Sequence, residues 1–113
     1  MTPAETADLA ELLDAKRAEL EAELAALTRE EEDTTGIAFG KRVGDGTSVA
    51  VERLAQVAAH DRLQAMLADV RRAREKLDDG TYGRCDTCGR LIGRERLEAL
   101  PWATMCIEDA ARR

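Results

Sequence analysis

The three cysteines of this 113-residue chain all lie within its last 30 residues. Cys85 and Cys88 form a Cys-x-x-Cys pair that is followed directly by Gly89. Two thiolates three positions apart can bind one metal ion, and the glycine permits the tight turn behind them. A finger with four cysteine ligands would place its last ligand three positions after Cys106, where this chain has Asp109. The pattern predicts a small C-terminal zinc-binding module in which an aspartate replaces one cysteine.

The same residues allow two other interpretations of this module. Asp109 could cap a short terminal helix while the three thiols stay free of metal, or Cys85 and Cys88 could form a disulfide and leave Cys106 as a free thiol. Few cysteines with one Cys-x-x-Cys pair fit a reducing compartment, and a carboxylate can bind zinc at about 2.0–2.2 Å. We therefore favour one zinc ion bound by Cys85, Cys88, Cys106 and Asp109, with a lower affinity than four cysteines would give.

The composition favours long helices over a thick hydrophobic core. Charged residues make up 35% of the chain and aromatic residues only 3%, and the apolar residues are mostly alanine and leucine. The net charge of −6 arises from residues 1–33, which contain 11 acidic and 3 basic residues. This excess of negative charge makes the chain a poor candidate for general nucleic-acid binding, which needs clustered cations. No apolar run approaches the roughly 18 residues of a membrane span, and no signal peptide is evident, so we expect a cytoplasmic protein.

Local signals predict two long helices joined by a turn. Thr2 and Glu5 form a capping box around Pro3, so the first helix should cover about residues 3–33. Residues 34–47 contain four glycines and should form the turn. The second helix should then cover about residues 48–79.

Leucine-rich stripes then predict how these two helices pair. A seven-residue spacing relates Leu13, Leu20 and Leu27 in the first helix, and Leu63, Val70 and Leu77 in the second. This spacing is typical of a coiled coil, and the glycine-rich turn favours folding back over dimerisation. We predict an all-α fold with an antiparallel helical hairpin over residues 1–80 and a zinc finger with a short terminal helix over residues 81–113. A monomer is the expected oligomeric state.

The finger carries a specific family resemblance. From Tyr82 to Cys106 the sequence reads Tyr-Gly-x-Cys-x-x-Cys-Gly-x-x-Ile-x-x-x-Arg-Leu-x-Ala-x-Pro-x-Ala-x-x-Cys. This spacing, directly after a long helical hairpin, resembles the DksA/TraR family. The resemblance implies a bacterial transcription regulator that binds RNA polymerase rather than DNA. It implies further that the hairpin tip enters the secondary channel of the polymerase, near the catalytic magnesium, and modulates initiation.

The tip of this chain differs from the family's tip motif, which is Asp-x-x-Asp-x-Ala. Counted from the finger without gaps, the corresponding positions are Arg42, Asp45 and Thr47, so only Asp45 matches. The resemblance implies that these three residues contact the polymerase. Phe39, an aromatic residue among glycines, is a candidate for the same contact because interface hot spots favour aromatic side chains. A turn role for Asp45 and local packing for Phe39 are the alternatives.

The same count addresses guanosine tetraphosphate, which the family binds through basic residues. The corresponding positions are Arg62, Asp69 and Ala110, and only Arg62 is basic. We therefore expect weak binding of this nucleotide, or none.

Other functional classes agree less well with the sequence. A nucleic-acid-binding zinc ribbon is disfavoured because residues 82–113 carry a net charge of only +1 and offer no aromatic stacking platform. A structural coiled coil without polymerase activity stays open. We expect no enzyme, because His60 is the only histidine, no catalytic triad or phosphate loop is present, and a zinc ion with four protein ligands has no open position.

Overall fold

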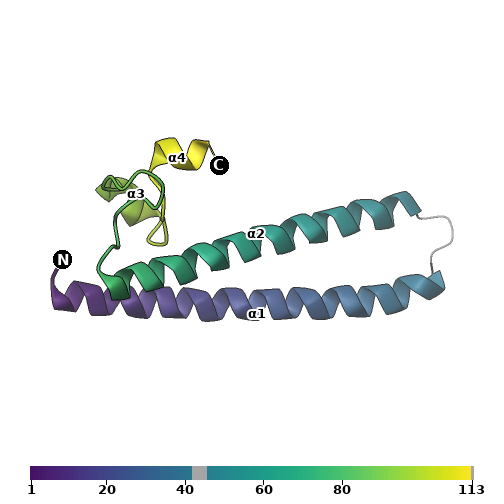
Figure 1. The fold of residues 1–113 in the computed structure, drawn as a ribbon. Helices are drawn as coiled ribbons and strands as arrows, with labels where there is room; N and C mark the ends of the chain where they lie inside the picture. Colours follow the sequence, from purple (N-terminus) through teal and green to yellow (C-terminus); the bar gives the residue numbers. More distant parts are fainter. Residues whose placement is uncertain (42–45, 113) are drawn as a thin grey trace. The chain divides into compact units, whose positions relative to one another are not determined.

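The computed structural model describes the backbone of residues 1–41 and 46–112, and the side chains of residues 1–29 and 50–112. The helices in this part of the chain are α1 (Pro3–Lys41), α2 (Gly46–Asp79), α3 (Arg94–Ala99) and α4 (Ile107–Ala111) (Figure 1). The described residues form no β-strand, and Arg84 and Leu91 make an isolated antiparallel bridge. The fold is therefore all-α, as predicted. Within the described residues, no helix has an apolar stretch long enough to cross a bilayer.

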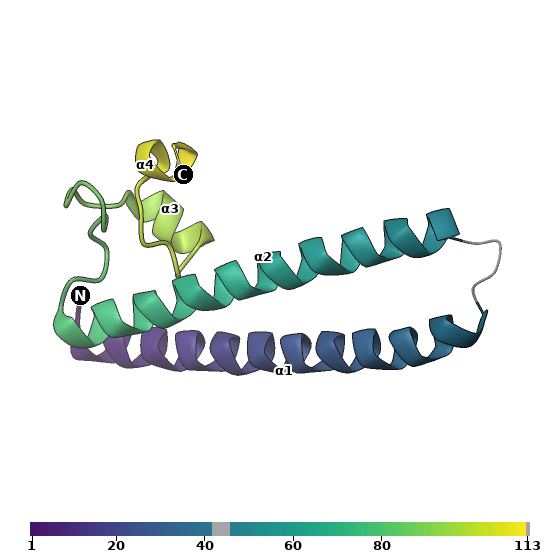
Figure 2. The same cartoon turned by 45° about the vertical axis from the view of Figure 1, so that its right-hand side comes forward.

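The chain divides into two compact units, one formed by residues 1–18 with 67–113 and the other by residues 19–66. Within each unit, a piece of α1 lies beside a piece of α2 that runs in the opposite direction (Figure 1, Figure 2). This pairing is that of an antiparallel helical hairpin. The boundary that the sequence predicts at residue 80 falls inside the first unit, because the last part of α2 belongs to the same unit as the finger.

The start of α1 follows the predicted capping box. The Glu5 amide donates a hydrogen bond to Thr2 Oγ1 at 3.2 Å, and the Thr2 amide donates to Glu5 Oε2 at 3.3 Å. These reciprocal bonds satisfy two amides that would otherwise lack partners at the helix start.

The end of α1 differs from the prediction. The helix continues to Lys41 instead of ending near Asp33, and α2 begins at Gly46. The predicted turn over residues 34–47 is therefore too long. A glycine inside a helix costs only about 1 kcal/mol relative to alanine, and each residue added to an existing helix gains one hydrogen bond. Glycine content alone was thus a poor indicator of where the helix ends.

The end of α2 at Asp79 agrees with the predicted bound of the second helix. Gly80 has a φ of +83°, in the left-handed region that glycine adopts without strain. The amides of Thr81 and Tyr82 donate to the Lys76 carbonyl at 2.9 and 3.1 Å. These bonds close the last turn of the helix in the way typical of a glycine C-terminal cap.

The hydrophobic seam is only partly where the sequence placed it. Leu13, Leu20 and Val70 are at most 1% exposed, which confirms the seven-residue stripes. Leu54 and Val57, which are apolar residues earlier in α2, are 70% and 50% exposed and do not belong to the buried seam. In a coiled coil the buried positions recur every 3.5 residues on average. Counted back from the half-buried Leu63, these positions are 59–60 and 56, and they are half-buried.

The finger is attached to the helices of its own unit by polar and aromatic contacts. Ile92 and Ala103 are buried, whereas Leu91 is 71% exposed. The Tyr82 hydroxyl donates to the Pro101 carbonyl at 2.8 Å. From α1, the Lys16 ammonium lies 5.4 Å from the centre of the Trp102 ring, within the range of a cation–π interaction.

Candidate metal centre

Four side chains from two short segments converge in the finger. Cys85 and Cys88 come from the loop between α2 and α3, Cys106 is the N-cap of α4, and Asp109 lies in the first turn of α4. Their ligand atoms all lie within 4.8 Å of one another, a grouping that could hold a metal ion. The structure thus brings together the four residues that the sequence singled out. All three cysteines are free thiols, so the Cys85–Cys88 disulfide is not formed.

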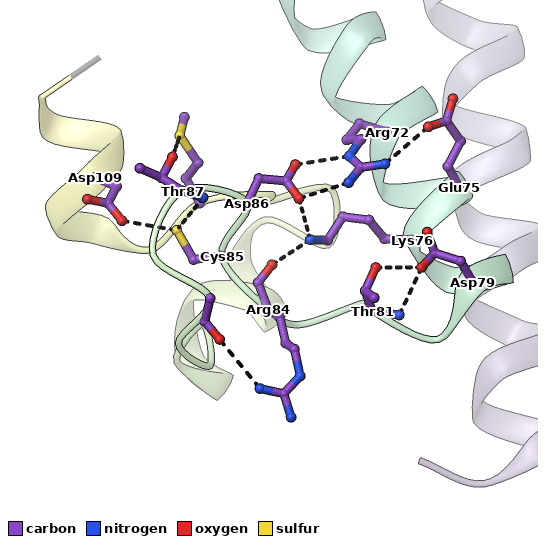
Figure 3. Close-up of polar contacts among 12 residues, drawn as sticks. Arg72, Glu75, Lys76, Asp79, Thr81, Arg84, Cys85, Asp86, Thr87 and Asp109 are labelled. Carbon is purple, nitrogen blue, oxygen red and sulfur yellow. Dashed lines mark hydrogen bonds and ion pairs between the residues drawn. The ribbon is translucent and has the colours of Figure 1, made fainter.

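The loop that carries the first two cysteines is shaped by backbone hydrogen bonds. The Cys85 amide donates to the Arg90 carbonyl at 2.8 Å, and the Gly89 amide donates back to the Cys85 carbonyl at 2.9 Å. Gly89 has a φ of +74°, which explains why a glycine follows the Cys-x-x-Cys pair. The Thr87 amide donates to Cys85 Sγ at 3.4 Å (Figure 3). The turn thereby points both sulfur atoms to the same side.

The spacing of the ligand atoms fits a tetrahedral zinc ion. Zinc–sulfur bonds of about 2.3 Å place two sulfur ligands of a tetrahedron about 3.8 Å apart, and Cys88 Sγ lies 3.9 Å from Cys106 Sγ. Asp109 Oδ2 lies 3.1 Å from Cys85 Sγ and 3.3 Å from Cys106 Sγ. An oxygen ligand bonds at the shorter distance of about 2.0–2.2 Å, so these closer approaches suit a carboxylate in the fourth position.

The electrostatics of the four groups favour a cation between them. Hydrogen bonds from Cys85, Cys88 and Cys106 hold the pKa of the Asp109 carboxyl below its usual range. Burial opposes ionisation of Cys85, but backbone hydrogen bonds from Cys88, Cys106 and Thr87 lower its pKa overall. At Cys88 the Arg90 amide lowers the pKa, while Asp109, desolvation and the neighbouring thiols raise it to about 11. Metal binding displaces such a proton, because the thiolate is the ligand.

The interpretation of Asp109 as a helix cap fits the geometry less well. The N-cap of α4 is Cys106, which makes no side-chain capping hydrogen bond. The Asp109 carboxylate instead accepts hydrogen bonds from the Cys85 and Cys106 thiols. Its orientation toward the sulfur atoms is consistent with a role as a metal ligand.

A polar network beside the metal centre was not anticipated from the sequence. The Asp86 carboxylate accepts two hydrogen bonds from the Arg72 guanidinium, at 3.0 and 3.1 Å, and one from Lys76 Nζ at 2.7 Å (Figure 3). These bonds, led by the one from Arg72, hold the pKa of Asp86 below its usual range although burial opposes this. The sequence does contain a signal for this network: Asp86 lies between Cys85 and Cys88, and Arg72 and Lys76 are one helical turn apart on α2.

The predicted tip residues cannot be assessed in the same way. Arg42 and Asp45 lie outside the described residues, as do the side chains of Phe39 and Thr47. Their contact with a polymerase therefore stays a prediction from the sequence.

Comparison with known proteins decides the family. The model of the prokaryotic dksA/traR C4-type zinc finger matches residues 80–112. The solved structure of transcription factor DksA2 from Pseudomonas aeruginosa is similar over 99% of this chain and 84% of that chain, with a TM-score of 0.78 and 31% sequence identity. The chain belongs to the DksA/TraR family. Asp109 distinguishes this member from the four-cysteine type that the family's description names.

Curated relatives agree with this assignment. RNA polymerase-binding transcription factor DksA from Caulobacter vibrioides is 34% identical over 70 residues, which make up 62% of this chain and 49% of that protein. General stress protein 16O from Bacillus subtilis is 36% identical over 69 residues, or 61% of this chain and 42% of that protein. This DksA/TraR member thus aligns with about half the length of these relatives. Bacterial relatives named as polymerase-binding transcription factors confirm the resemblance seen in the sequence.

Proposed function

We propose that this DksA/TraR protein is a transcription regulator that binds bacterial RNA polymerase and inserts its hairpin tip into the secondary channel to modulate initiation. The observation that carries the proposal is the likeness to DksA2, which spans hairpin and finger together over 99% of the chain. The related Caulobacter vibrioides protein is named as polymerase-binding. A pair of helices, each about 10–12 Å across with its side chains, is narrow enough to enter a channel that would exclude a globular domain.

The contacts of the finger arginines argue against nucleic acid as the partner. Arg94 pairs with Glu98 at 3.2 Å, and Arg96 donates to the Met105 carbonyl at 2.9 Å. Phosphate binding needs several cations directed at a backbone, whereas Arg96 is engaged within the finger and the exposed Arg94 already has an acidic neighbour. The proposal therefore includes no specific DNA binding. Separately, it takes the chain to be a monomer. It also includes weak or no binding of guanosine tetraphosphate.

Within this function, we assign the metal centre a structural role. Cys85, Cys88, Cys106 and Asp109 bind one zinc ion and fix the loop after α2 to the start of α4. Their ligand atoms already lie at separations that suit a tetrahedral site. Four protein ligands leave no open position for a substrate or an activated water, so the proposed protein is not an enzyme.

Replacing Asp109 by cysteine is expected to raise the zinc affinity by about tenfold or more, which corresponds to about 1.4 kcal/mol or more. A thiolate is a softer and better matched ligand for zinc than a carboxylate in such a structural site. Competition with a chromophoric chelator measures the change, and Asp109→Ala is expected to shift the affinity in the opposite direction. Equal affinities for the wild-type chain and both variants would show that Asp109 does not bind the metal.

Capture of core RNA polymerase by the purified full-length chain tests the proposed function. We expect direct capture, and crosslinking of a photoreactive residue introduced at position 43 to the wall of the secondary channel. Failure to capture the polymerase would overturn the proposal. A gel shift on free DNA or RNA that weakens with salt would favour the zinc-ribbon alternative.

The double variant Arg42→Asp/Thr47→Ala restores the family's tip motif and tests the role of the tip. We expect the effect on open-complex stability to increase severalfold while polymerase affinity changes little, because the proposed tip acts near the catalytic magnesium. Arg53→Asp, an equal charge change on the exposed surface of α2, is the matched control. An equal gain in both variants would mean that overall charge, and not the motif, determines activity.

A further inference from the structure

Lys76 is the most deeply buried charged residue among the described residues. Its side chain is 2% exposed, and burial of an ammonium group is costly unless the charge is paired and its donors are satisfied. Lys76 Nζ donates to Asp86 Oδ1 at 2.7 Å and to the Arg84 carbonyl at 2.6 Å. Both acceptors lie in the finger loop, immediately before and after Cys85. The buried cation of α2 is therefore satisfied by the segment that carries a proposed metal ligand.

Asp86 is held from three directions. Arg72 Nε and Nη2 bind its two oxygens at 3.0 and 3.1 Å in a fork geometry that fixes a carboxylate in orientation as well as in position. Its amide donates to the Thr104 carbonyl at 2.8 Å, on the segment that leads to Cys106. Figure 3 shows Asp86 between the α2 cations on one side and Cys85 with Asp109 on the other. One residue thus touches α2 and both segments that carry the ligands.

We propose that Asp86 is a positioning residue that couples metal binding in the finger to the stability of α2 residues 67–79. The proposal rests on the metal site proposed above. Metal binding fixes the turn from Cys85 to Cys88, and the turn sets the direction of the Asp86 carboxylate. In that direction Asp86 binds Arg72 and Lys76, which are one helical turn apart on α2, at the same time.

The coupling acts in both directions. Since binding free energies are reciprocal, metal stabilises the end of α2 by as much as an ordered α2 strengthens metal binding. Residues that orient metal ligands without binding the metal typically change affinity by about 10- to 100-fold when they are replaced. Asp86 is expected to behave as such a residue, although its carboxylate belongs to the α2 network and not to the ligand set.

The test compares the full-length wild-type chain with Asp86→Asn, which keeps the shape of the side chain and removes its charge. Cobalt(II) is the spectroscopic probe, and amide hydrogen exchange at residues 67–79, with and without zinc, reports on α2. In the wild-type chain, we expect zinc to slow this exchange by about 5- to 150-fold, the usual range of such coupling. In Asp86→Asn, we expect the same tetrahedral thiolate spectrum, an affinity lower by about 10- to 100-fold, and loss of the zinc effect on α2.

Matched variants separate this role from general destabilisation. Glu98→Gln removes one finger carboxylate whose partner is the exposed Arg94, and it is expected to behave like the wild-type chain. Arg72→Gln removes the fork together with the exposed pair between Arg72 and Glu75, and it serves as the second variant if Asp86→Asn does not fold. Asp86→Glu is expected to recover part of the coupling. Unchanged zinc protection of α2 in Asp86→Asn or Arg72→Gln would overturn the coupling alone. Absence of cobalt binding to the wild-type chain would overturn the metal site and the coupling with it.

Discussion

Replacing Leu13 by alanine is expected to lower the free energy of unfolding by about 2–5 kcal/mol. The Leu13 side chain is 0% exposed in the unit that joins residues 1–18 to residues 67–113. The deletion would remove buried methyl groups and leave a cavity, and total stabilities of small domains are only about 5–15 kcal/mol. Urea denaturation, followed by circular dichroism at 222 nm, measures the loss.

Leu12 provides a control of identical chemistry at the next position. It is 45% exposed, so the same substitution is expected to cost about 1 kcal/mol or less. Both variants change helix propensity in the same way, and the difference between them therefore reports burial in the seam. Equal losses for Leu12→Ala and Leu13→Ala would contradict the assignment of the seam.

Replacing Cys85 by serine is expected to abolish zinc binding and disorder the finger. Cys85 is 3% exposed and supplies the most buried of the proposed ligands. Structural zinc sites contribute about 10–16 kcal/mol of binding free energy in isolated finger peptides at neutral pH, so the folded finger depends strongly on a complete ligand set. Elemental analysis is expected to fall from one zinc ion per chain to nearly none, with loss of slow amide exchange over residues 80–112.

The control for this substitution is Arg94→Gln. The Arg94 side chain lies in the finger, is 92% exposed and is not one of the proposed ligands. It is expected to keep one zinc ion and the exchange pattern of the wild-type chain. A Cys85→Ser chain that retained full zinc content would disprove the ligand assignment. A chain that lost zinc but kept its slow exchange would show that the metal does not hold the finger together.

Short-range chemistry made much of this protein predictable from its sequence. The Thr2–Glu5 capping box, the Gly80 terminus and the glycine after Cys88 each depend on a few neighbouring residues, and each has the expected geometry. The grouping of the four proposed ligands was predictable because their spacing in the sequence is typical of a zinc site. Heptad spacing likewise identified the buried residues Leu13 and Val70.

The features that the sequence did not reveal depend on small opposing free energies or on contacts between residues that are distant in the sequence. Gly36 and Gly40 lower helix propensity, yet α1 continues through both to Lys41, since extension of an existing helix offsets a modest local cost. From the sequence alone, Lys76 is expected to be an ordinary hydrated cation near the end of a helix. In the structure its buried ammonium group pairs with Asp86, ten residues later, and no local propensity encodes that pairing.

The two units differ in how soon each can form during synthesis on the ribosome. Residues 19–66 form one unit from a continuous stretch of chain, whereas the other unit needs residues 1–18 together with residues 67–113. Contacts between distant segments form late, because closing the intervening loop costs entropy before any contact compensates for it. During synthesis, the continuous stretch can therefore pair its helices first, while the leading segment waits for the cysteine-bearing one to emerge.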